Sequence, residues 1–172
     1  MAVRRTAFER VGGFDTALET CEDVDLCRKL RAQGYRLVAD GRLHNIHYGD
    51  PRTLRHVFVG ELWRGRDNVR VSLRAPRSWR TLLSAAIPMF NLAALAVIAI
   101  GVVSGTSLGL ASAALAGLSV LVLMTLRASL MVRAASPDFL RALAVAAAYE
   151  LGRALALTAR VGYGRRRRGA MA

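Results

Sequence analysis

The chain has 172 residues, 53% of them hydrophobic, and a formal net charge of +13 because 25 lysine or arginine residues oppose 12 acidic ones. A nucleic-acid-binding domain gathers its basic residues with aromatic ones on a recognisable module, and none is found, so we expect no nucleic-acid partner. The two cysteines, Cys21 and Cys27, lack the number and spacing of a disulfide framework or zinc knuckle. We expect small buried thiols in a reducing compartment.

The first elements in the chain are a predicted glycine turn and a predicted helix. Two adjacent glycines within Val11–Asp15 indicate the turn. Thr20 with Asp23 three residues later has the form of a capping box, so a helix should begin near Thr20. Gly34 is a good terminator because glycine readily adopts the left-handed conformation that ends helices.

A β-hairpin and a second helix are predicted next. Residues 35–39 and 42–48 have the composition of two strands, and the Asp-Gly pair at residues 40–41 predicts the tight turn between them. Asp50 followed by Pro51 then predicts the start of a helix, with aspartate as the cap and proline in the first turn.

The helix after Pro51 is expected to lie on a membrane surface and to lead into two membrane spans. Its apolar residues fall near one stripe and its arginines on much of the rest, with Trp63 and Trp79 as interfacial anchors. Residues 81–126 then contain no charged side chain. At about 1.5 Å per residue, this stretch fits two helices that each cross a hydrocarbon core about 30 Å thick, with residues 104–107 as the polar turn.

The distribution of arginines predicts the topology of this hairpin. They flank both of its ends and are absent from its turn, so we expect a multi-pass protein of the cytoplasmic (inner) membrane with both termini in the cytoplasm. No apolar segment follows Met1, so we expect no secretory signal peptide. The four arginines at 165–168 are expected to meet anionic headgroups of membrane lipids.

The apolar segment at residues 139–161 is harder to assign. Four charged residues interrupt it, namely Arg141, Glu150, Arg153 and Arg160. Each would cost on the order of 2.5 to 3.5 kcal/mol at the centre of a bilayer, and a third span would place the arginine tail outside. We therefore expect an interfacial helix with Glu150 and Arg153 paired at i, i+3, and keep a third span as the alternative.

Three carboxylates fall within four positions at the start of the first predicted helix: Glu22, Asp23 and Asp25. They could be ordinary N-terminal acids, each stabilised by the helix dipole by about 0.3 to 1 kcal/mol. The same field could instead keep a carboxylate ionised at the mouth of a cleft, where it can take a proton from an attacking hydroxyl. The acids alone favour the structural interpretation.

The wider pattern resembles the C-terminal part of the catalytic domain of family 2 glycosyltransferases. The matching segments, in order, are Ala2–Arg5, Phe8, Val11–Asp15, Glu22–Cys27 and Gly34–Leu37, and the resemblance extends to about Leu73. It implies a GT-A type α/β fold and inverting sugar transfer from a nucleotide-sugar donor to a hydroxyl acceptor, for which a lipid-linked alcohol is one candidate. A trailing membrane hairpin is also common in that family.

The predicted fold class is accordingly an α/β fragment followed by membrane helices. Residues 1–75 would form the C-terminal portion of a GT-A-like domain together with the amphipathic interface helix. Residues 81–126 would form the α-helical transmembrane hairpin, and residues 137–172 the interfacial helix and basic tail.

The resemblance also implies roles for single residues. The aspartate of the family's Glu-Asp pair is the base that deprotonates the acceptor, and that position matches Asp23, while Glu22 and Asp25 would shape the acceptor site. A divalent metal, Mg²⁺ or Mn²⁺, normally neutralises the diphosphate leaving group. His47 is a candidate ligand for it, or else an ordinary polar residue on a half-exposed strand.

A second motif of the family lies near Trp63. Processive members carry a Gln/Arg-x-x-Arg-Trp motif at about this distance, in which Arg64 has a match, but Glu61 and Gly65 replace the first and last members. Processivity is therefore not expected. Trp63, Arg64 and Arg66 remain candidate substrate-binding residues, the arginines through charge-assisted hydrogen bonds to a diphosphate, or else lipid-facing charges.

The family's nucleotide-binding half, with its Asp-x-Asp metal motif, has no counterpart in these residues, because Asp23 and Asp25, which do have this spacing, belong to the later Glu-Asp motif. We expect it upstream of residue 1 or on a separate partner chain. The alternative function, suggested by this missing half and by the arginine-rich flanks, is a non-catalytic membrane adaptor or partner subunit whose basic surface binds anionic lipid.

Overall fold

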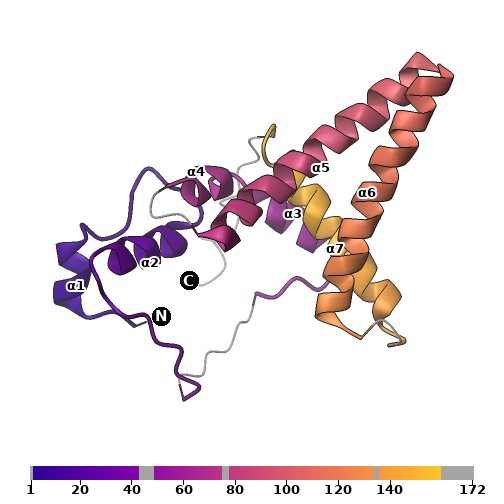
Figure 1. The fold of residues 1–172 in the computed structure, drawn as a ribbon. Coiled ribbons are helices and arrows are strands. Elements are labelled where there is room, and N and C mark those ends of the chain that lie inside the picture. Colours follow the sequence, from indigo (N-terminus) through magenta and orange to yellow (C-terminus); the bar gives the residue numbers. More distant parts are fainter. Residues whose placement is uncertain (1, 43–48, 75–77, 134–135, 160–172) are drawn as a thin grey trace, which may run out of the picture.

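The computed structural model describes residues 2–42, 49–74, 78–133 and 136–159, and every regular element in these ranges is a helix (Figure 1). The helices are α1 (Arg5–Arg10), α2 (Glu22–Ala32), α3 (Leu54–Arg64), α4 (Asn68–Ser72), α5 (Trp79–Ser104), α6 (Ser107–Met131) and α7 (Phe139–Leu155). The long hairpin of α5 and α6 projects from a base formed with α3 and α7, and α1 and α2 form a lobe on the other side of α4.

The prediction of an α/β fragment over residues 1–75 is wrong, because the regular elements described there are helices. Residues 35–39, predicted as the first strand, have no regular structure. A strand needs the N–H and C=O groups of a neighbour, and the described ranges offer it none. The turn that follows does form, since Asp40 Oδ1 accepts a hydrogen bond from Arg42 N at 3.0 Å. Residues 43–48 of the second predicted strand lie outside the described residues.

The lobe of residues 2–42, called here the N-terminal lobe, has a small core between α1 and α2. Ala7, Leu26 and Leu30 are its buried members. The predicted glycine turn is confirmed, because Gly12 and Gly13 have φ values of 74° and 62°, which glycine adopts at little cost. A Cβ at residue 13 would lie 3.0 Å from the Phe8 ring, so glycine also permits a close approach there.

Helix α2 starts and ends nearly where predicted, but its start uses other contacts. Its N-cap is Cys21, at φ 61°, and no side chain caps it. Thr20 bonds Asp67 in place of its own helix: its side-chain Oγ1 accepts from Asp67 N at 3.3 Å, and its backbone N–H donates to Asp67 Oδ2 at 3.2 Å. The predicted Thr20 capping box is therefore wrong, while Gly34, at φ 79°, follows the helix end as expected.

The helix predicted from Asp50 onward is shorter and interrupted. Helix α3 begins at Leu54, and its cap is Thr53, whose Oγ1 accepts from His56 N at 3.2 Å. The helix stops before Gly65, where a Cβ would lie 2.6 Å from the Ala156 Cβ. The close approach of α3 to the end of α7 explains glycine at this position, and α4 continues the chain in a new direction.

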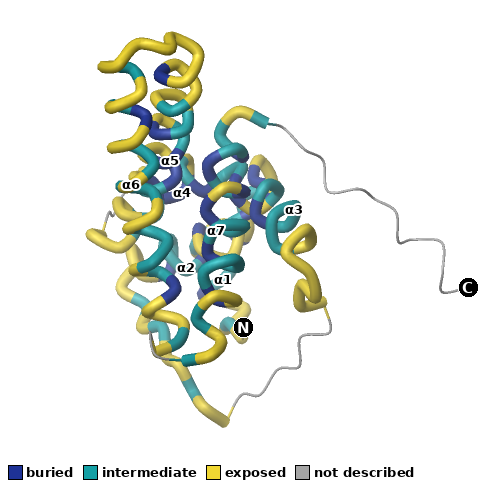
Figure 2. The backbone as a smooth tube through the Cα atoms, turned by 90° about the vertical axis from the view of Figure 1, so that its right-hand side faces the viewer, coloured by how far each residue is buried: buried dark blue, intermediate teal, exposed yellow. Residues whose placement is uncertain are grey.

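The hairpin prediction is confirmed as two helices joined by a polar turn. Gly105 is left-handed at φ 63°, and Thr106 Oγ1 caps α6 by accepting from Gly109 N at 3.0 Å. Both helices are long and apolar enough to cross a membrane, yet only 22% of the most apolar window of α5 and 6% of that of α6 are buried (Figure 2). Within the described residues, neither helix is therefore packed like the core helix of a soluble domain.

Helix α7 packs mainly on α3 and also contacts α5 and α6. Its buried face contains three alanines and Gly152, and a Cβ at residue 152 would lie 2.7 Å from the Phe58 carbonyl oxygen. This close packing brings the charged residues of α7 against three other helices. The helix predicted within residues 139–161 is thus present, with one face buried (Figure 2).

Candidate functional site

The start of α2 meets the junction of α3 and α4. Cys21 Sγ donates to the Arg64 carbonyl oxygen at 3.8 Å, and Arg66 Nη2 donates to Glu19 Oε1 at 3.1 Å. Burial raises the pKa of the Cys21 thiol, so this cysteine is a neutral contact and not a reactive thiolate. The acidic motif that contains Glu22 and Asp23 therefore adjoins the arginine motif that contains Trp63, Arg64 and Arg66. The two motifs are at least 40 residues apart in sequence.

Glu22 and Asp23 are exposed on the first turn of α2 at this junction. Asp23 Oδ1 accepts from the Val24 backbone N–H at 2.7 Å. Within the described residues no ion pair engages Asp23, so its carboxylate is open to an approaching molecule. The geometry permits it to accept a proton from a bound hydroxyl.

Asp25 is placed differently from its two acidic neighbours, because its side chain is fully buried among cations. Arg28 lies at 2.9 Å, Lys29 at 3.3 Å and Arg74 at 2.8 Å from its oxygens. Burial raises the pKa of Asp25, but the hydrogen bonds from Arg74, Arg28 and Lys29 outweigh it and hold the pKa below its ordinary value. Buried charges require such partners. Asp25 therefore positions α2 against the segment after α4.

Arg74 joins the N-terminal lobe to the rest of the molecule through a second carboxylate. Its Nη2 donates to Asp15 Oδ2 at 2.9 Å, while its Nη1 binds Asp25. A backbone hydrogen bond from Ala17 and the side-chain bond from Arg74 lower the pKa of Asp15. This bridge could not be predicted from the sequence, because Arg74 is one of several arginines on a predicted polar helix face.

Two of the three predicted arginine-motif residues line a cavity on one side of α3. Trp63 and Arg64 enclose it with Asp50, His56 and neighbouring residues, and its volume is about 450 Å³. Arg64 Nη1 is held by Glu61 Oε1 at 2.8 Å. Arg66 turns instead toward Glu19.

The described residues supply no metal site. No group of three or more His, Cys, Asp or Glu side chains within them could hold an ion. His47 lies outside the described residues, so its predicted role as a ligand stays a prediction. The Mg²⁺ or Mn²⁺ that the resemblance implies therefore has no fitting ligand set in the part of the chain that is described.

A second polar cluster lies at the base of the hairpin. Glu150 Oε1 is 2.7 Å from Arg127 Nε of α6, and Glu150 Oε2 accepts from Asn91 Nδ2 of α5 at 2.9 Å. Arg153 Nη2 donates to Asn68 Oδ1 at 3.3 Å, and its Nε lies 3.3 Å from Glu61 Oε2. The predicted pair of Glu150 with Arg153 is wrong, because each side chain turns to a different helix.

This cluster could not be predicted from the sequence, because its members come from distant segments of the chain. Asn91 was a usable signal, since a polar amide within a long apolar run needs a hydrogen-bonding partner when buried. Glu61 was noticed only as a departure from a family motif. Its buried side chain joins the two arginines Arg64 and Arg153.

No family model matches the chain, and neither the curated proteins nor the solved structures include a significant match to it. The resemblance to family 2 glycosyltransferases thus depends on the order and spacing of the motifs themselves.

Proposed function

We propose that this chain is the acceptor-side part of a membrane-bound, inverting glycosyltransferase, with Asp23 as the base that deprotonates the acceptor hydroxyl. The observation that supports the proposal is the contact between the start of α2 and the α3–α4 junction. That contact holds Cys21, two residues before the exposed Asp23, against the Arg64 carbonyl oxygen. A general base must be accessible and held on a rigid element, and the first turn of α2 provides both.

The proposed reaction is a single displacement. A carboxylate oxygen of Asp23 takes the proton of the acceptor hydroxyl while the hydroxyl oxygen forms a bond to the anomeric carbon. The bond from that carbon to the diphosphate oxygen breaks, and the nucleoside diphosphate leaves on the opposite face with inversion. Of the two arginines, Arg64 is the better candidate for binding the diphosphate, because Arg64 lines the cavity on α3 and Arg66 turns toward Glu19.

The donor site belongs to another polypeptide segment in this proposal. An upstream segment or a partner chain supplies the nucleotide-binding residues and the ligands for any divalent metal. When bound, such a metal would neutralise the charge of the departing diphosphate. The residues of this chain provide the base, the acceptor side and the membrane attachment.

The membrane attachment in this proposal is the hairpin of α5 and α6. Its outward side chains are large and apolar, and Leu108 and Leu130 expose 80% and 90% of their surface. Such continuous apolar surface is stable in a bilayer and a liability in water. We place both helices across the cytoplasmic membrane with both termini in the cytoplasm, following the arginines at the base.

Replacing the proposed base tests this function. In membranes that contain the chain together with its donor-binding segment, Asp23→Asn should reduce the rate of sugar transfer by about 10² to 10⁴-fold. The matched control is Glu9→Gln, which changes another exposed carboxylate of the N-terminal lobe and should leave the rate unchanged. Near-normal transfer by Asp23→Asn would contradict the assignment.

A second candidate is a non-catalytic membrane adaptor or partner subunit. The observation that favours it is the arginine-lined base of the hairpin, which suits attachment to lipid without any chemistry. The same experiment separates the two functions. If a partner enzyme needs this chain for activity but tolerates Asp23→Asn, the adaptor function is correct.

A further inference from the structure

A polar pocket of about 300 Å³ opens at the base of the hairpin, between α5, α6 and α7. Three arginines line it, one from each of these helices: Arg80, Arg127 and Arg153. Glu150 is the only acidic residue in the lining, and Arg127 and Asn91 already bind both of its oxygens. Glu61, which lies outside the lining, is 3.3 Å from Arg153 Nε, so the uncompensated positive charge of the pocket is that of Arg80. This charge favours an anion.

Several hydrogen-bond donors in this pocket are unused. Arg80 is exposed and has no partner among the residues that the structure describes. The shortest contact of Arg127 with Glu150 is through Nε, and its two Nη groups make no hydrogen bond to the residues that the structure describes. The Tyr149 hydroxyl makes no hydrogen bond within the described ranges. Arginine donors and a phenolic hydroxyl that line one pocket suit the oxygens of a phosphate, which accepts several charge-assisted hydrogen bonds at once.

Tyr149 holds two of the three arginines of the pocket, Arg127 and Arg153. The Arg127 guanidinium lies 4.0 Å from the centre of the Tyr149 ring and the Arg153 guanidinium 5.1 Å from it. Cation–π contacts of this kind hold guanidinium groups in place without consuming their N–H donors. The α6 and α7 sides of the pocket are thus organised before an anion arrives.

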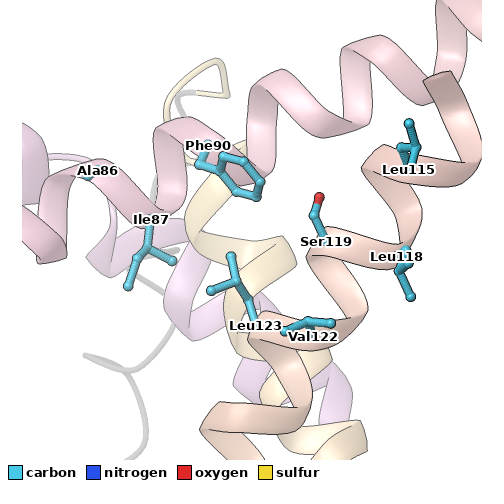
Figure 3. Close-up of a pocket in the computed structure, with 8 residues that line it drawn as sticks. All are labelled: Ala86, Ile87, Phe90, Leu115, Leu118, Ser119, Val122 and Leu123. Atoms are coloured by element: carbon cyan, nitrogen blue, oxygen red, sulfur yellow. The ribbon is translucent and has the colours of Figure 1, made fainter.

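Apolar cavities continue from this polar pocket along the hairpin. Ile87 lines the polar pocket and also a cavity of about 600 Å³ between α5 and α6. Figure 3 shows Phe90 of α5 and Leu123 of α6 pointing toward each other across this groove. A third cavity, of about 370 Å³, shares Ile87 and Arg127 with the polar pocket and Leu123 with the groove. An anionic site thus adjoins a path for a hydrocarbon chain.

The depth of the polar pocket matches the headgroup region of a bilayer. Arg127 follows Ser107, the first residue of α6, by 20 positions, which corresponds to about 30 Å of helix at about 1.5 Å per residue. The hydrocarbon core is about 30 Å thick. With the turn at one surface of the membrane, Arg80 and Arg127 lie at the level of the lipid phosphates of the other.

We propose that this site binds one anionic glycerophospholipid of the bilayer, with its phosphate in the arginine-lined pocket and one acyl chain in the groove between α5 and α6. The combination of a charged pocket, a connected apolar groove and headgroup depth selects a phospholipid over a soluble anion. The inference depends on the membrane placement proposed above and does not depend on sugar transfer.

Lipid titration of the full chain tests the proposal. The chain is purified in mild detergent, titrated with phosphatidylglycerol or with phosphatidylcholine of the same acyl chains, and observed by native mass spectrometry. Wild-type protein should retain one phosphatidylglycerol in preference to phosphatidylcholine. Arg80→Gln should weaken retention about 5-fold, the effect of one basic residue near a phosphate surface. Arg133→Gln, an exposed arginine at the same end of α6 and outside the pocket, is the matched control and should change nothing.

A second variant tests the groove independently of charge. Ser119 lines the groove, and Ser119→Phe should fill it and displace phosphatidylglycerol while leaving the arginines in place. Circular dichroism of each variant checks that the helices are intact. Equal retention of the two lipids, equal loss in Arg80→Gln and Arg133→Gln, or unchanged binding by Ser119→Phe would overturn the proposal.

Two competing ligands complete the test. If inorganic phosphate displaces the lipid at millimolar concentration, the site recognises a soluble anion and the proposal fails. If a polyprenyl phosphate is retained in preference to phosphatidylglycerol, the site serves a lipid-linked substrate and the assignment to a bilayer phospholipid fails. None of these measurements uses a sugar donor, so their outcome is separate from that of the Asp23→Asn experiment.

Discussion

Two buried carboxylates, Asp25 in the N-terminal lobe and Glu150 at the base of the hairpin, are held in different ways. Asp25 has three cationic partners, two of them from its own helix. Glu150 has one arginine and one amide, both from other helices. Asp25 keeps two cationic partners if one is lost, whereas Glu150 has no second cation to replace Arg127. The hairpin base should therefore be the more sensitive of the two regions to a single substitution.

The largest effect is expected from Glu150→Ala. Removing this carboxylate leaves the buried Asn91 amide and the partly exposed Arg127 without their partner. The expected cost is about 3 kcal/mol of unfolding free energy, the lower end of the range for breaking a buried ion pair. Thermal unfolding in detergent, followed by tryptophan fluorescence, measures it. Asp138→Ala removes an exposed carboxylate of the same segment, paired with Arg141, and should cost less than about 1 kcal/mol. Equal effects of the two variants would contradict the comparison.

Arg74→Ala should have an intermediate effect. Asp25 keeps Arg28 and Lys29 after this change, so the expected cost is that of lost hydrogen bonds to a charged group, about 1.5 to 3 kcal/mol. Hydrogen exchange should show faster opening of α2 than of α7, because Arg74 connects the N-terminal lobe to α4 through Asp15 and Asp25. Arg42→Ala, which breaks only the exposed pair with Asp40, is the control. Uniform exchange changes throughout the chain would argue against a local bridge.

Acid should weaken the N-terminal lobe. The pKa values of Asp15 and Asp25 are lower in the folded chain than in the unfolded one, where aspartate has a pKa of about 3.9. The stability that these carboxylates confer is complete above that pH and is lost as the pH falls below it toward the folded pKa values. Hydrogen exchange of α2 measured from pH 6 down to pH 2.5, corrected for intrinsic rates, should show this loss. In Arg74→Ala the acid-dependent loss should be smaller, and an unchanged profile would contradict the assigned cause.

The comparison of regions also shows what could be predicted from the sequence. The hairpin was predictable because its signal, an uncharged run with a polar turn, lies within one continuous segment, and Gly34 was predictable for the same reason. The partner of Glu150 was not, because helical spacing offered Arg153 while the fold supplied Arg127 and Asn91. Rules for pairing residues along one helix take no account of side chains from other helices.

The N-terminal lobe was harder to predict because its sequence resembles that of a larger domain. Residues 35–39 have strand composition, but a strand forms only beside another, and the described part of the chain offers no partner. Thr20 fits a capping box, but Asp67 engages its side chain instead. Asp23 stays exposed as the proposed base requires, and no signal within the motif alone told it apart from the buried Asp25.

The smallest expected effect comes from replacing the N-cap of α3, the helix that packs on α7. Two residues are candidates for this cap. The sequence favoured Asp50, and the structure uses Thr53, whose hydroxyl accepts from His56 N at 3.2 Å. Thr53→Ala should cost about 1 kcal/mol of unfolding free energy, because an N–H group of the first turn loses its acceptor. Asp50→Ala should cost less than about 0.5 kcal/mol, since its side chain caps no helix. If Asp50→Ala were the more destabilising variant, the helix would begin earlier than Leu54, and the base of the hairpin would owe part of its stability to the segment before α3.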